Sequence, residues 1–224
     1  MTLVVVVAVC WQLSGDEMAI TYPLTMPVIN NPAQITLSAE NVVSKSTSPF
    51  TFSEQTFVHP GQRWTASVTL PPMKRDYAEQ WISFLMSLKG RQGYFLLFDP
   101  NAETIQGTVT GVVRVNGASQ IGSSLTVDGL GANRVNAFKA GDYIQLGSGA
   151  TSRLHKVLTD VTADALGGAT LDIWPDLRES PVNNAVVTYT TASGLFRLDS
   201  NITSWNINSM SSYGITFDCT EYVW

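Results

Sequence analysis

The sequence predicts a mainly β protein with one α-helix, in which a small β-barrel or sandwich is inserted into a β-sandwich domain. Short runs that alternate apolar and polar residues occur on both sides of a single segment with helical spacing. Glycines become frequent after residue 107, whereas aromatic residues are frequent at 50–98 and again after 195. We therefore expect a discontinuous domain over 18–106 plus 196–224, and an inserted β-barrel domain over 107–195.

The strands expected before the insert are recognised by alternation or by continuous apolar character. WTASVTL alternates and ends at a proline, as a half-buried strand does, whereas YFLLF is apolar throughout and suits a strand buried on both faces. The strands expected here cover residues 34–39, 50–57, 64–70 and 94–98.

The helix is expected over about residues 74–89, within KRDYAEQWISFLMSLKG. Its apolar residues recur at the three-to-four spacing of one helical face. Asp76 suits the first turn, and Lys89 with Gly90 suits the end. The residues expected on the buried face are Tyr77, Trp81, Phe84, Leu85 and Leu88.

The insert and the C-terminal segment contain further short strands separated by turn signals. Gly167-Gly168 is one such turn. Asn116-Gly117 is a pair favoured in two-residue hairpin turns, but the two expected strands around it are separated by eight residues, so a simple two-residue hairpin is uncertain here. The strands expected here cover 109–115, 124–127, 142–146, 153–158, 169–173, 186–190, 195–198, 205–207, 213–217 and 222–224.

The composition favours some classes of function and disfavours others. Charged residues make up 14% of the chain, which favours a subunit whose faces are covered by neighbours, although a monomer rich in Ser, Thr and Asn has the same composition. The net charge is −5, and no stretch concentrates Lys or Arg. A protein that grips nucleic-acid phosphates needs such a basic stripe, so this class is disfavoured.

The N-terminal region has an apolar run, LVVVVAVCW, that is too short to span a bilayer and lacks the features of a secretory signal. The codons of Gly15-Asp16-Glu17 can provide a ribosome-binding sequence just before Met18. We therefore expect translation to start at Met18 and residues 1–17 to be a non-native extension. Cys10 and Cys219 lie at opposite ends of the chain and are expected to be unpaired thiols.

Catalytic and metal-binding signatures are not apparent. His59 lies in an apparent Pro-Gly turn (HPG) and His155 in an expected strand, and neither has a second ligand at zinc spacing or a nucleophile motif. The carboxylate pairs Asp160/Asp164 and Asp176/Glu179 are candidates by proximity only, and their neighbours are typical of turns. Calcium binding through Asp142, Asp160 or Asp164 lacks a recognised loop pattern. We expect no catalytic residue, no metal site and no cofactor.

Tryptophans are the remaining candidates for contact residues. Trp64 and Trp81 occupy positions that the pattern assigns to the core. Trp174, Trp205 and Trp224 are less constrained, and tryptophan is enriched where subunits meet. We therefore take these three as possible interface or ligand contacts.

Two runs that flank the helix carry a resemblance to a known family. Residues 48–73 read SPFTFSEQTFVHPGQRWTASVTLPPM, and residues 90–100 read GRQGYFLLFDP. The insert adds VNGASQ, AGDYI and WPDLR at 115–120, 140–144 and 174–178. Together they resemble the distal tail, or minor tail, proteins at the tail tip of long-tailed bacteriophages and prophages, over residues 18–224.

This resemblance implies a structural virion protein that is not an enzyme. Proteins of this family form a ring, commonly a hexamer, that joins the tail tube to the tip or baseplate and its receptor-binding apparatus. The implied partners are further copies of the chain, the tail tube protein and other tip proteins, with assembly in the bacterial cytoplasm and no membrane insertion. DNA would pass through the lumen without specific binding, which suits an acidic chain.

Two other classes of function stay open at this point. The insert resembles oligosaccharide-binding folds in some tail proteins, so a carbohydrate-binding module that adheres to host surface polysaccharide is the alternative. An exposed Trp174 in a groove with acids would favour it. A cell-wall hydrolase would need His59 or His155 beside a nucleophile.

Overall fold

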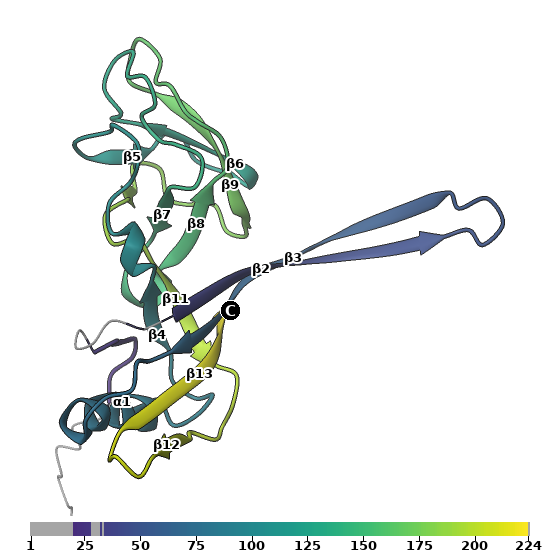
Figure 1. Ribbon diagram of the computed structural model, residues 1–224. Helices are drawn as coiled ribbons and strands as arrows, with labels where there is room; N and C mark the ends of the chain where they lie inside the picture. Colours follow the sequence, from purple (N-terminus) through teal and green to yellow (C-terminus); the bar gives the residue numbers. More distant parts are fainter. Residues whose placement is uncertain (1–19, 28–31, 33, 224) are drawn as a thin grey trace, which may run out of the picture.

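A computed structural model describes residues 20–27, 32 and 34–223 of the chain. It confirms a mainly β protein with one α-helix in the described part. Figure 1 shows a β-sheet with its helix, a separate barrel, and a long two-stranded arm that projects from the body. The predicted extension over 1–17 lies outside the described residues, and so do Cys10 and Trp224.

The sheet combines strands from the two ends of the described chain. Its order is β1-β4-β11-β13-β3-β2, and β12 pairs with β13 beside this path. The β1–β4 pair is parallel, and the other pairs are antiparallel. The strands are β1 (Leu24–Thr25), β2 (Gln34–Thr47), β3 (Glu54–Thr69), β4 (Phe95–Phe98), β11 (Ser193–Leu198), β12 (Trp205–Ile207) and β13 (Tyr213–Glu221).

Helix α1 (Arg75–Ser87) covers one face of this sheet and buries a continuous aromatic cluster. Trp81 packs edge-on against Phe84, and Phe84 packs edge-on against Phe95 of β4. Tyr77, which the spacing placed on the buried face, is instead 45% exposed. Side chains on a helix lean towards its N-terminus, so a side chain in the first turn points past the start of the helix. Leu88, just after the helix, is buried as expected.

The barrel is closed by the order β10-β5-β6-β9-β8-β7. Apolar side chains of its strands and Phe138 from a connecting loop form its core. Tyr143 of β7 and Leu154 of β8 instead belong to the core of the sheet. The strands are β5 (Val113–Val115), β6 (Gly122–Asp128), β7 (Tyr143–Leu146), β8 (Arg153–Val157), β9 (Ala169–Leu177) and β10 (Val186–Thr188), and the short 3-10 helices are η1 (Pro100–Ala102) and η2 (Gly149–Thr151). All six strands fall inside 107–195, whereas β11 already belongs to the sheet from Ser193 onwards.

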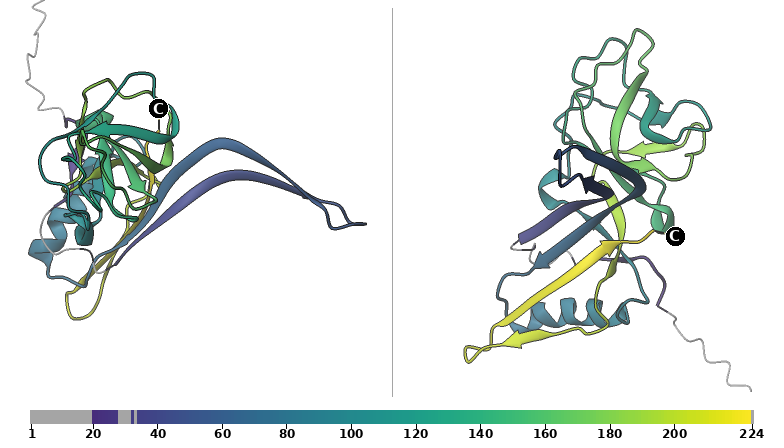
Figure 2. Two further views of the ribbon diagram at one scale, coloured as in Figure 1. Left: turned by 90° about the horizontal axis from the view of Figure 1, so that it is seen from above. Right: turned by 90° about the vertical axis from the view of Figure 1, so that its right-hand side faces the viewer.

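The arm is the outer part of the β2–β3 hairpin, from Glu40 to Pro60, which we call the arm throughout. Except for Ser48 at the tip turn, every residue of this stretch is exposed. The tip is held by reciprocal backbone hydrogen bonds between Ser48 and the segment Phe52–Ser53. In Figure 2 the arm curves as it leaves the body.

Three local predictions in and near the arm are wrong. His59-Pro60-Gly61 is not a turn: it lies within β3, and the strand register shifts where Val42 faces it. Proline is tolerated there because a bulge interrupts the hydrogen-bond ladder, and a bulge also bends the hairpin. A side chain in place of Gly61 would collide with Val42, since an added Cβ lies 2.7 Å from a Val42 methyl carbon.

The other two errors concern strand ends. Residues 50–53, expected as strand, form the tip turn, where Phe52 has a positive φ of 55°. At the C-terminus β13 already ends at Glu221, so Tyr222 and Val223 are not strand. No helix within the described ranges has the length and apolar character needed to cross a membrane.

Candidate functional site

Trp174 lies at the junction between the barrel and the sheet. Its indole is half-buried and meets Trp64 of β3 edge-on, with ring centroids 4.5 Å apart. Its Nε1 donates to Asn41 Oδ1 at the start of the arm, at 2.9 Å. Trp64 Nε1 in turn donates to the Leu154 carbonyl of β8 at 3.0 Å. The predicted contact residue Trp174 therefore joins two parts of the same chain.

Trp205 lies on β12, which pairs with β13 alone among the described strands. It is 38% exposed, and Ile202, Ile207 and Met210 in the same segment are more exposed still. This segment fits the predicted role of an interface contact better than Trp174 does. Trp174 and Trp205 lie in different parts of the structure, and Trp224 lies outside its described part.

The two histidines lie in unrelated surroundings. His155 is buried in the barrel wall, and its Nδ1 forms a 2.7 Å hydrogen bond with the Pro175 carbonyl. Burial lowers its pKa to about 4, so the imidazole is neutral near pH 7. His59 lies on the exposed arm, with Ser44 Oγ 3.5 Å from its Nε2. Among the described residues, neither ring is hydrogen-bonded to a carboxylate.

The acidic candidates mainly hold turns together. Asp142 is buried and accepts hydrogen bonds from the backbone amides of Gln106, Gly107 and Lys139. Asp164 accepts amides in its own turn, and these bonds lower its pKa. Among the described residues no group of three or more His, Cys, Asp or Glu is arranged to hold a metal ion.

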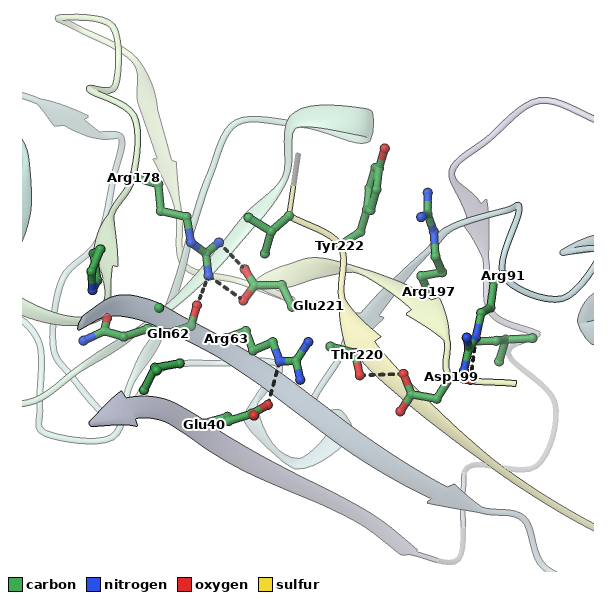
Figure 3. A pocket seen from close by; sticks show the side chains of 15 residues that line it. Glu40, Gln62, Arg63, Arg91, Arg178, Arg197, Asp199, Thr220, Glu221 and Tyr222 are labelled. Atoms are coloured by element: carbon green, nitrogen blue, oxygen red, sulfur yellow. Dashed lines mark hydrogen bonds and ion pairs between the residues drawn. The ribbon is translucent and has the colours of Figure 1, made fainter. Parts of the chain in front are cut away.

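The most distinctive polar feature is a groove at the base of the arm, which we call the arginine groove (Figure 3). It has a volume of about 680 Å³ and is lined by the arm base, the end of β13 and the end of β11. Four of the chain's eight arginines line it: Arg63, Arg91, Arg178 and Arg197. These arginines are far apart in the sequence, so no local sequence motif predicts the groove.

Two of these arginines are paired with carboxylates. Arg63 Nε donates to Glu40 Oε2 at 2.6 Å across the hairpin, and this hydrogen bond lowers the pKa of Glu40. Arg178 reaches over from the barrel and holds both oxygens of Glu221, each at 3.2 Å. The Glu221 side chain is almost fully buried and also accepts the backbone amide of Trp64. The second pair therefore fastens the barrel to the sheet.

The other two arginines are not bonded to carboxylates. Arg91 donates to the backbone carbonyl of Asp199, whose carboxylate instead accepts the Thr220 hydroxyl at 2.6 Å. Arg197 stacks on the ring of Tyr222, 4.0 Å from its centroid, and its Nε is buried with no acceptor. Figure 3 shows these two side chains at the same end of the groove. This end can bind an anionic group, because neither guanidinium there is hydrogen-bonded to a carboxylate, and Asp199 is the one acidic residue beside them.

No protein-family model matches the chain, and no curated protein matches it.

Proposed function

We propose that this chain is a structural subunit of a phage tail tip that assembles with further copies of itself into a ring, with six copies as the expected number. The observation that carries this proposal is the arm. It extends beyond the sheet, and its exposed side chains include Phe50, Phe52 and Val58, which are 91%, 79% and 78% exposed.

An arm of this kind needs a partner on physical grounds. A two-stranded hairpin with no third strand and no packed face is marginally stable in water. Its ion pairs, Lys45–Glu54 and Arg63–Glu40, lie at exposed positions, where such pairs contribute little to stability. Exposed apolar side chains gathered on one projection are typical of an interaction surface. Contact with a neighbouring subunit would bury them.

The strand edges support the same proposal. β2 ends the sheet on one side, so its outer edge has no partner strand in the described part of the chain. Unpaired strand edges are templates for pairing with another chain. Repetition of one such contact gives a ring when the rotation between neighbours closes, and a ring is the assembly that the resemblance implies.

The carbohydrate-binding alternative receives less support. It needs a free aromatic face beside polar groups, but Trp174 is half-buried against Trp64 and its indole nitrogen is already bonded to Asn41. The hydrolase class has no nucleophile recorded beside either histidine except the exposed Ser44, 3.5 Å from His59.

The experiment is electron microscopy of purified phage particles that carry this gene, with gold-labelled antibody against residues 107–195. We expect label at the end of the tail away from the capsid, and rings in negative-stain images of the purified chain. An antibody against the major capsid protein is the control for labelling. Intact and disrupted particles that both stay unlabelled, while the free protein is detected, would exclude the structural role.

A further inference from the structure

The arginine groove concentrates positive charge in an acidic chain. The chain has 18 acidic and 13 basic residues, yet four of its eight arginines line this groove. Four guanidinium groups there face three carboxylates, those of Glu40, Asp199 and Glu221. With four arginines and three carboxylates the groove carries a net charge of +1, and the rest of the chain carries −6. The charge distribution therefore makes the groove and the remaining surface complementary.

Arg197 is the group that most clearly lacks a partner. Its Nε is buried and has no hydrogen-bond acceptor, which is uncommon in native structures and unfavourable. The nearby carboxylates do not supply one, because Asp199 is bonded to Thr220 and Glu221 to Arg178. Because this atom is buried, an acceptor on another molecule could reach the guanidinium only at its terminal nitrogens.

The position of Arg197 is prepared for such an acceptor. Its guanidinium stacks on Tyr222, and Tyr222 also stacks on Tyr94, with centroids 5.2 Å apart and rings inclined by 15°. This stack fixes the guanidinium plane, and a guanidinium binds a carboxylate through its edge with two parallel hydrogen bonds.

The same stack limits what the groove can hold. A neutral sugar is recognised by packing on a free aromatic face. Tyr94 and Arg197 already pack on the Tyr222 ring. The other walls are aliphatic, from Val42, Pro60 and Leu198. The groove therefore fits an acidic side chain on a protein surface, with apolar contacts around it.

We propose that the arginine groove is a docking site for an acidic side chain of a second copy of this chain, held by Arg91 and Arg197. The proposal rests on the proposed ring, in which each subunit presents one surface to a different surface of its neighbour. A second copy offers suitable carboxylates, since Asp160, Asp164 and Asp172 are exposed on the barrel.

The test is self-association of the full chain, measured by mass photometry and sedimentation as a function of protein concentration. Arg197→Gln and the double variant Arg91→Gln/Arg197→Gln should each raise the dissociation constant at least about ten-fold. Raising NaCl from about 50 mM to about 500 mM should weaken the wild type more than the double variant.

Two further variants separate docking from general effects of charge or folding. Arg75→Gln removes the same charge from an exposed position on α1 and should leave self-association unchanged. Arg197→Lys keeps the charge but loses the bidentate guanidinium donor, so its affinity for self-association should lie between those of the wild type and Arg197→Gln. Thermal unfolding of each variant shows whether it is folded.

The outcomes are distinguishable. Rings that form equally well in the folded double variant would overturn the groove proposal and leave the proposed function standing. A wild-type chain that stays monomeric at every concentration and is absent from tails would overturn both. Groove variants that self-associate normally but fail to enter tails would assign the groove to a different tail protein and overturn docking between copies.

Discussion

The two halves of the β2–β3 hairpin are paired by the same two strands but differ in burial. In the inner half, Trp64, Ala66 and Val68 are buried against α1, the barrel and β13. In the arm, every residue except Ser48 is exposed. The bulge at Val42 and His59-Pro60-Gly61 lies between the two halves. Strand pairing alone therefore does not make a stable element: the inner half is stabilised by packing within the chain, and the arm lacks it.

The largest effect should come from the inner half. Trp64→Ala removes a side chain that is 4% exposed and packs on Trp174 and Tyr143. We expect the free energy of unfolding to fall by about 4 kcal/mol, measured by urea denaturation. Phe57→Ala in the arm, where the ring is 54% exposed, should change it by less than about 0.5 kcal/mol. Similar losses in both variants would contradict the division between the halves.

The junction beside the inner half should respond to pH. His155 has a pKa of about 4 in the folded chain because it is buried, against 6.5 for an unperturbed histidine. Between these values the unfolded chain binds a proton that the folded chain does not, so stability falls as pH decreases from about 6.5 to about 4. This residue should contribute about 3 kcal/mol of that loss.

The measurement is the difference in unfolding free energy between wild type and His155→Gln from pH 7 to pH 4. The carboxylates titrate in both proteins, so the difference isolates the histidine. A constant difference across this range would show that His155 is protonated equally in the folded and unfolded chain.

The Arg178–Glu221 pair should have a smaller effect, because the Arg178 side chain is 24% exposed. Arg178→Ala leaves the buried Glu221 carboxylate without its cation and should cost about 2 kcal/mol of unfolding free energy. Glu221→Gln in the same background should lose less than the two separate changes added together. Strict additivity in this double-mutant cycle would mean that the pair does not couple the barrel to the sheet.

The smallest effect on stability, with the largest on assembly, is expected at the arm tip. Phe50→Ser/Phe52→Ser replaces two exposed rings and should change the unfolding free energy by less than about 0.5 kcal/mol. If the arm docks on a neighbour, the same variant should lose its rings in negative-stain images. If the variant still assembles into rings in these images, the arm tip does not contribute to the interface.

The elements that sequence analysis located correctly are those specified by local patterns. The spacing of Trp81, Phe84 and Leu85 predicted α1, and alternation predicted the inner part of β3. HPG was misread because proline and glycine signal a turn in isolation, whereas here they form a bulge opposite Val42. Nothing within a few residues of His59 shows that β2 lies alongside it.

By itself, the sequence determined the mainly β class, the single helix in the described part and the position of the barrel strands, because each depends on periodicity over a few residues. Only the tertiary structure decided that Trp174 packs on Trp64 and that four arginines meet at the base of the arm. These contacts join residues that are distant in sequence, whereas periodicity relates only residues a few positions apart. The arm shows the same limit, since residues that alternate as a strand are left exposed when no part of the chain packs against them.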